Sequence, residues 1–168
     1  MMKKSVKWLI APSVTLGAVF LLTLVGTSAA RAEATVASKS PGTSPGDLDA
    51  RRRMALGMIE TGNNDYEIGG AGEVSRYQIM PSVWKHYSQS SRYQNPEISL
   101  AVAQRHWSQL YSDFIKQAHR EPSDFDMYVL WNTRYGYYAS KGFKASRLSP
   151  TVRDRAERFV NLVNRANT

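Results

Sequence analysis

From residue 48 onward, apolar residues recur mainly at intervals of three and four, which is the spacing of one face of a helix. A first helix is expected to start after a capping carboxylate, Asp47 or Asp49, and to run to Glu60. The apolar residues of its expected buried face are Leu48, Met54 or Ala55, Met58 and Ile59.

Prolines and a capping box predict where the later helices begin. Pro81 suits a first helical turn, and Pro96 opens a longer amphipathic helix. The apolar positions of that longer helix are Ile98, Ala101, Val102, Trp107, Leu110, Tyr111, Phe114 and Ile115. Ser123 and Asp126 have capping-box spacing, and Pro150 begins the last helix. The expected buried face of the last helix comprises Val152, Ala156, Phe159, Val160 and Val163.

The segment between the first two helices has a different pattern. Residues 62–72 are rich in glycine and asparagine and cannot hold a regular helix. Apolar and polar residues then alternate from Val74 to Ile79, which is a weak strand signal. The sequence therefore predicts a mainly α fold (α+β) with a small β element and no internal repeat.

The first 46 residues are expected to lie outside the folded domain. Residues 1–32 have the order of a secretory signal: a lysine-rich start, an apolar core and a small-x-small site at Ala30-Arg31-Ala32. This site and Pro12 favour cleavage over a retained membrane anchor. Residues 33–46 are small, polar and rich in Pro and Gly, as in a flexible tether. Residues 47–168 then form one domain.

Charge and cysteine usage narrow the class of protein. The formal charge is +8, and the signal carries away four basic residues and no acid, which leaves +4. This mild excess suits a polyanionic neighbour such as a cell wall, or serves only solubility. The chain has no cysteine, so a disulfide scaffold, thiol catalysis and a cysteine-linked lipid anchor are excluded. An exported bacterial envelope protein fits these features, located in the periplasm or outside the cell.

Glu60 is the first candidate for catalysis. It stands where an apolar helix opens into the Gly- and Asn-rich loop. Apolar neighbours raise the pKa of a carboxyl group toward working pH, as a general acid requires. Glycoside cleavage most often needs such a group. The alternative is a structural carboxylate that caps a helix or pairs with an arginine.

Several motifs occur around Glu60 in a characteristic order. They are Glu60-Thr61-Gly62, Gln78-Ile79-Met80-Pro81, Asn95-Pro96-Glu97-Ile98 and, in altered form, Leu130-Trp131-Asn132-Thr133-Arg134. In this order they resemble the catalytic domain of soluble lytic transglycosylases and goose-type lysozymes, from about Arg51 to Arg165. The resemblance implies a lysozyme-like fold, a helical bundle with a small β element beside a catalytic cleft.

The resemblance also implies a reaction and a set of site residues. A glutamate matched by Glu60 protonates the glycosidic oxygen of peptidoglycan and then acts as a base, and an anhydro sugar results. Gln78 and Asn132 would line the cleft, with Arg76 and Tyr77 beside them. Trp131 replaces the family's tyrosine, so Tyr135, Tyr137 or Tyr138 would supply the hydroxyl near Glu60. No cofactor is implied.

Glu73 departs from the transglycosylase pattern, because a small or apolar residue is typical there. A second carboxylate across the cleft would suit a lysozyme-like hydrolase that uses Glu60 and Glu73. The alternative is that Glu73 pairs with Arg76 or another basic residue.

The wider alternatives concern partners. The expected partner is the glycan strand of peptidoglycan, and an envelope machine is a possible recruiter. A rival from another class is a wall-binding or secretion-system accessory protein with weak catalysis. Nucleic acid is not expected for an exported chain. His86, His106 and His119 lack the spacing of a metal site.

Overall fold

The computed structural model describes residues 44–134 and 136–165, which all belong to one structural unit, Lys39–Thr168. The expected signal, residues 1–32, and most of the expected tether lie outside the described residues. Six α-helices and one 3-10 helix make up the described part. They are α1 (Ala50–Thr61), α2 (Pro81–Tyr87), α3 (Pro96–Ala118), α4 (Asp124–Asn132), α5 (Tyr137–Ser140), η1 (Ala145–Arg147) and α6 (Pro150–Arg165). The mainly α prediction is confirmed.

The starts of the helices follow the local signals in the sequence. Asp49 caps α1 by accepting from the amides of Arg51 and Arg52 at 3.0 and 2.9 Å. Ser123 and Asp126 form both bonds of a capping box at the start of α4. Such caps satisfy amides that have no partner inside the helix. The predictions of α2, α3 and α6 from their prolines are also confirmed.

The buried face predicted for the first helix is confirmed at Leu48 and Ala55 and is wrong at Met58. Met54 and Met58, one turn apart, are 56% and 48% exposed, whereas Ala55 and Leu56 are buried. Since α1 packs against α6, the face that α6 covers decides which residues are buried. The two methionines lie on the other side of the helix and face solvent.

The predicted strand from Val74 to Ile79 is wrong. No strand occurs in residues 44–134 and 136–165. Val74 and Ile79 instead form an isolated antiparallel bridge with each other. Their amides and carbonyls bond at 2.9 and 3.0 Å. Ser75 and Gln78 have positive φ, 66° and 51°, so the chain reverses within the four residues between the bridge partners. The alternating pattern belongs to a tight turn.

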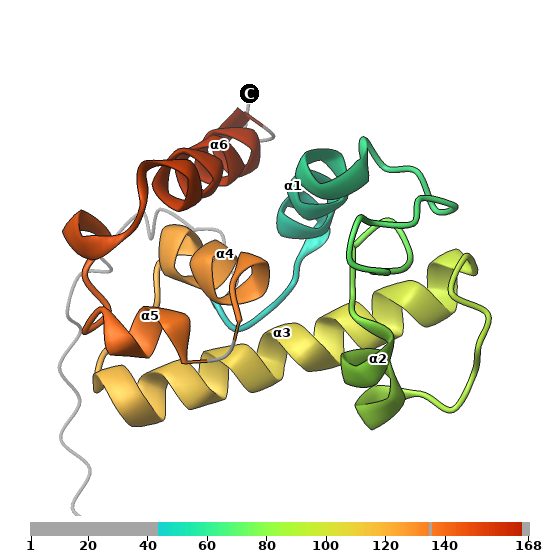
Figure 1. The fold of residues 1–168 in the computed structure, drawn as a ribbon, viewed down its shortest axis with the longest axis horizontal. Helices are drawn as coiled ribbons and strands as arrows, with labels where there is room; N and C mark the ends of the chain where they lie inside the picture. Colours follow the sequence, from blue (N-terminus) through green and yellow to red (C-terminus); the bar gives the residue numbers. More distant parts are fainter. Residues whose placement is uncertain (1–43, 135, 166–168) are drawn as a thin grey trace, which may run out of the picture. The chain divides into compact units, whose positions relative to one another are not determined.

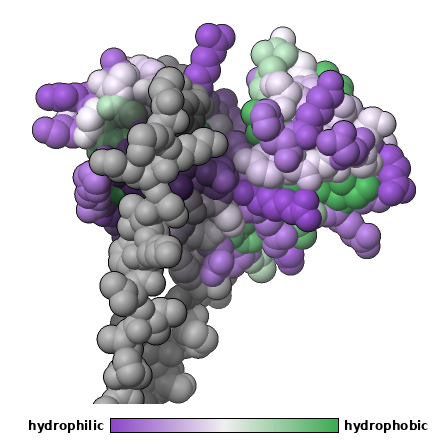
Figure 2. Space-filling view, turned by 90° about the horizontal axis from the view of Figure 1, so that it is seen from below, coloured by the Kyte–Doolittle hydropathy of each residue, from purple (hydrophilic) through white to green (hydrophobic). Residues whose placement is uncertain are grey.

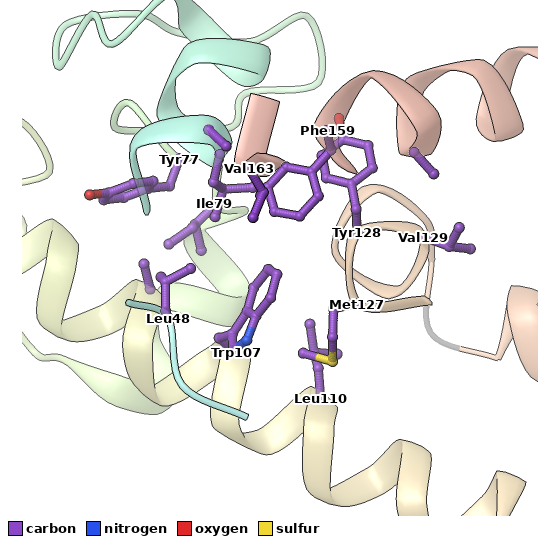
Figure 3. Packing of buried hydrophobic residues seen from close by; sticks show 14 of the residues in the cluster. Leu48, Tyr77, Ile79, Trp107, Leu110, Met127, Tyr128, Val129, Phe159 and Val163 are labelled. Carbon is purple, nitrogen blue, oxygen red and sulfur yellow. The ribbon is translucent and has the colours of Figure 1, made fainter. Parts of the chain in front are cut away.

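Helix α4 lies at the centre of the packing, against α6 on one side and α3 on the other (Figure 1). Aromatic rings fill the space between these helices. Tyr128 of α4 stacks on Phe159 of α6 with ring centroids 4.9 Å apart, and Phe159 lies 6.0 Å from Trp107 of α3 (Figure 3). All three side chains are fully buried. Burial of large rings is the main stabilising contribution in such a core.

Residues 44–46, placed at the end of the tether by the sequence, are bound to the helical domain. Arg52 Nη1 donates to the Ser44 carbonyl at 2.9 Å, and Trp107 Nε1 donates to the Pro45 carbonyl at 2.9 Å. A side chain at Gly46 would collide with the ring of Tyr111. The folded part of the chain therefore includes Ser44.

The outer face of α3 is polar. Gln104, Arg105, Ser108, Gln109 and Ser112 are exposed or line only a shallow depression. Figure 2 shows the surface of the molecule from below the view of Figure 1. The described residues on this side are mostly hydrophilic, with smaller hydrophobic areas between them. None of the helices in the described ranges has the length and apolar character needed to cross a membrane.

Candidate functional site

A cleft of about 680 Å³ lies between the loop before α2, helices α3 and α4, and the chain from Thr133 to Arg155. Its volume is in the range of ordinary ligand sites. Glu60, Glu73, Gln78 and Asn132 all line it, although they come from three separate segments of the chain. The structure therefore brings together most of the site residues expected from the sequence.

Glu60 lies in the last turn of α1, and its side chain is almost completely buried in the wall of this cleft, with 7% exposed. Its Oε1 accepts from the Tyr128 hydroxyl at 2.7 Å. Its Oε2 accepts from Arg155 Nη2 at 3.1 Å. Both carboxyl oxygens are thus held by donors from other helices, and the carboxyl group has a fixed orientation.

The surroundings of Glu60 raise the pKa of its carboxyl group. Burial is the largest cause, since it disfavours the charged form. The hydrogen bond from Tyr128 and the charge of Arg155 lower the pKa, while the negative charge of Glu73 raises it again. The net direction of the pKa is upward although Glu60 is ion-paired, because burial outweighs the contacts with Tyr128 and Arg155. A carboxyl group in this state keeps its proton to higher pH and can donate it.

The core of the domain positions the two partners of Glu60. The Tyr128 ring is held against Phe159, and Arg155 lies on α6 one turn before Phe159. Arg155 Nε also donates to the Tyr128 hydroxyl at 3.2 Å. Glu60, Tyr128 and Arg155 therefore form a closed network between α1, α4 and α6. Burial and the bond to Glu60 raise the pKa of Tyr128, so its hydroxyl remains a donor.

Glu73 and Gln78 face the same cleft from the loop before α2. The Ala71 amide donates to Glu73 Oε2 at 2.9 Å, and Gln78 Nε2 donates to the Ser75 carbonyl at 3.2 Å. A side chain at Gly69 would collide with both Glu73 and Gln78. A larger residue at this position would therefore require the ends of these two flexible side chains to shift.

Arg76 and Tyr77 do not line the cleft, which corrects the sequence-based assignment. Arg76 pairs with Asp65 through two nitrogens, so Glu73 does not have Arg76 as its partner. The Tyr77 side chain is 4% exposed and packs in the core, and its carbonyl accepts from Trp131 at 3.2 Å. Because the chain turns tightly here, Gln78 and Ile79 reach the cleft whereas Tyr77 enters the core.

The hydroxyl expected beside Glu60 comes from Tyr128. Tyr135 lies outside the described residues. Tyr138 points elsewhere and donates to Asp126 at 2.7 Å, and Tyr137 is not among the cleft residues. Sequence reasoning missed Tyr128, although it precedes Asn132 by one helical turn on the same helix. No local signal indicates Arg155, which is 95 positions from Glu60.

Aromatic rings form another wall of the cleft. His106 and Trp131 both line it, with ring centroids 5.1 Å apart. Burial, helped by the charge of His86, lowers the pKa of His106 to about 4, so the ring is neutral at neutral pH. Such a surface suits stacking against a sugar ring. Within the described part of the chain, no group of three His, Asp or Glu side chains is placed to hold a metal ion.

The chain was compared with protein families, curated proteins and solved structures. No protein-family model, curated protein or solved structure matches this chain. The geometry of the cleft, and the motifs to which Glu60, Gln78 and Asn132 belong, therefore indicate the function.

Proposed function

We propose that this chain is an exported bacterial glycosidase with a lysozyme-like fold that cleaves peptidoglycan as a lytic transglycosylase. The target is the β-1,4 bond between N-acetylmuramic acid and N-acetylglucosamine. One observation carries the proposal: Glu60 is a buried carboxyl group of raised pKa in the wall of a large cleft. The motifs around it support the choice of substrate.

In the proposed reaction, protonated Glu60 gives its proton to the glycosidic oxygen, and the bond between that oxygen and the muramic anomeric carbon breaks. The resulting glutamate then takes the proton of the muramic 6-hydroxyl as O6 attacks the anomeric carbon. A 1,6-anhydro muramic sugar forms, and Glu60 is protonated again. The reaction consumes no water and no cofactor, because O6 of the muramic sugar replaces the glycosidic oxygen at the anomeric carbon.

Tyr128 and Arg155 have roles that follow from their bonds to Glu60. After proton donation, Glu60 is a buried carboxylate, which is costly unless hydrogen-bonded donors surround it. The Tyr128 hydroxyl and the Arg155 guanidinium are already in place at 2.7 and 3.1 Å. They also direct the carboxyl group within the cleft. We assign both as positioning residues.

The rest of the cleft suits an amino-sugar chain. Gln78 and Asn132 offer amides, which both donate and accept and so match acetamido groups. His106 and Trp131 offer ring faces on which a sugar can lie.

A second candidate is a hydrolase in which Glu73 takes part. The observation that favours it is that Glu73 lines the same cleft and that its charge raises the pKa of Glu60. In that case Glu73 would activate a water molecule for attack on the anomeric carbon, and the product would carry a reducing end.

The products distinguish these candidates. Purified sacculi are incubated with protein lacking residues 1–32, and the released sugars are identified by mass spectrometry. Anhydro sugars support the transglycosylase, and loss of activity in Glu73→Gln with reducing ends from the unaltered protein supports the hydrolase. Glu67→Gln is the matched control, because Glu67 is exposed in the same loop and does not line the cleft. Binding without any release would leave an accessory wall-binding protein.

A further inference from the structure

Two arginines stand on the wall of the cleft that the C-terminal part of the chain supplies. Arg134 follows α4 and Arg155 belongs to α6, and both line the cleft. Arg134 is exposed, and within the described part of the chain it takes part in no ion pair. Arg155 reaches Glu60 with Nη2 and Tyr128 with Nε, yet 37% of its side chain remains exposed. Both arginine side chains therefore line the cleft and are at least partly exposed.

Basic residues are concentrated in the same C-terminal part of the chain that contains Arg134 and Arg155. Residues 44–133 contain nine Lys and Arg against eleven Asp and Glu, whereas residues 134–165 contain eight against two. The basic residues of the second group are Arg134, Lys141, Lys144, Arg147, Arg153, Arg155, Arg158 and Arg165. Glu60 and Glu73 thus line the cleft together with Arg134 and Arg155 from this strongly basic segment, and Arg155 pairs with Glu60. A ligand with an anionic group on one side matches this arrangement.

We propose that Arg134 and Arg155 bind a carboxylate carried by the glycan strand, and that this contact selects muramic sugars over sugars without an acid group. The inference rests on the proposed function, because muramic acid differs from glucosamine by its lactyl carboxyl group. That group is free where the peptide is missing, and peptide-bearing strands carry carboxylates on the peptide. Guanidinium groups pair with carboxylates through parallel hydrogen bonds, which lysine does not reproduce.

A substrate carboxylate on Arg155 also affects Glu60. Arg155 stabilises the ionised form of Glu60, together with Tyr128, whereas Glu73 opposes it. A second carboxylate that shares the Arg155 guanidinium weakens its hold on Glu60. Glu60 then keeps its proton more firmly when the correct sugar is bound. Recognition of the muramic sugar and readiness of the acid are coupled through one side chain.

The test measures binding separately from cleavage. Isothermal calorimetry on Glu60→Gln protein compares glycan oligomers with free lactyl carboxyl groups, the same oligomers with peptides, and chitin oligosaccharides of equal length. We expect at least one carboxylate-bearing ligand to bind about tenfold more tightly than chitin, the effect of one good charged hydrogen bond. The tighter of the two carboxylate-bearing ligands identifies whether the lactyl group or the peptide supplies the carboxylate.

Arginine variants assign the effect to the cleft. Arg134→Gln and Arg155→Gln are expected to reduce the preference over chitin to about threefold or less, and Arg155→Lys to restore only part of it. Arg158→Gln is the matched control on the same helix, because Arg158 is exposed and does not line the cleft. In protein with Glu60 intact, Arg134→Gln should raise KM and leave kcat nearly unchanged.

Two outcomes would overturn the inference. One is equal affinity for chitin and for both carboxylate-bearing ligands. The other is a loss of the preference over chitin in Arg158→Gln as large as that in Arg155→Gln. This result would indicate that the preference depends on the overall charge of the segment and not on a contact in the cleft. Failure of the proposed function looks different: the carboxylate preference holds and the arginine variants lose it, but sacculi release no sugar.

Discussion

Glu60 and Asp126 are two buried carboxylates with the same kinds of partner and opposite behaviour. Each accepts from a tyrosine hydroxyl at 2.7 Å, Tyr128 for Glu60 and Tyr138 for Asp126. Each also pairs with one arginine. Yet the pKa of Glu60 is raised and that of Asp126 is lowered.

The difference lies in the number of donors. Burial raises the pKa at both sites, but Asp126 accepts two bonds from Arg120, each at 2.8 Å, and two more from Ser123. These donors outweigh burial. Glu60 has a single bond from Arg155, at 3.1 Å, and faces a cleft. A fully satisfied carboxylate holds structure, whereas an under-satisfied one beside a cleft is available for proton transfer.

The largest expected effect is that of Glu60→Gln. The amide keeps the size of the side chain and cannot give a proton to the leaving oxygen, so sugar release from sacculi should fall by about 10²- to 10⁴-fold. The midpoint of thermal unfolding should change little. Full activity in this variant would place Glu60 in the same structural role as Asp126.

Asp126→Asn should affect stability. The amide leaves the Arg120 guanidinium and the Ser123 donors without their charged acceptor, and we expect a loss of about 2 kcal/mol in the free energy of unfolding. Denaturant titration measures it. Activity per folded molecule should be unchanged, and a specific loss of kcat at full folding would contradict the structural assignment.

Removal of the tyrosine hydroxyl at each carboxylate should have a smaller effect, and the two variants serve as controls for each other. Tyr128→Phe and Tyr138→Phe each remove one hydroxyl from a buried carboxylate and should each cost about 1 kcal/mol of stability. Only Tyr128→Phe should also move the pH profile of kcat/KM. Without this donor the pKa of Glu60 rises further, so the alkaline limb shifts to higher pH. A shift of equal size in Tyr138→Phe would refute the distinction.

The smallest expected effect is on the pH dependence of stability, which compares the pKa shifts of Asp126 and Glu60 directly. Because the folded pKa of Asp126 is below 3.8, its contribution is present above 3.8 and lost as pH falls through the folded pKa. The folded pKa of Glu60 is above 4.5, so its contribution is present below 4.5 and lost as pH rises through the folded pKa. The stability of Glu60→Gln relative to the unaltered protein should therefore increase with pH above 4.5. Urea titrations at several pH values measure this slope, and the opposite sign would contradict the raised pKa.

The sequence predicts those parts of the structure that depend on neighbours a few residues away. The cap at Asp49, the Ser123 capping box and the helix-opening prolines are local, and they are confirmed. The exposure of Met58 on α1 depends on how α6 packs, far along the chain, and the helical spacing predicts it wrongly. The turn from Val74 to Ile79 has strand-like alternation, but positive φ at Ser75 and Gln78 cannot be inferred from that pattern.

The candidate site divides in the same way. Glu60, Gln78 and Asn132 belong to short motifs, and the structure places all three in one cleft. Tyr128 and Arg155 are 68 and 95 positions from Glu60, and their contacts with it exist only because α1, α4 and α6 pack together. Tyr77 adjoins Gln78 in sequence but enters the core, since a tight turn sends neighbouring residues in different directions.

The bonds at Ser44 and Pro45 have a mechanical consequence. Tension on the chain ahead of Ser44 reaches α1 through Arg52 and α3 through Trp107 at the same time. The pulling force is thus shared between α1 and α3, and the contact with α3 is made by a fully buried indole. Such tension enters α1 at the end opposite to Glu60.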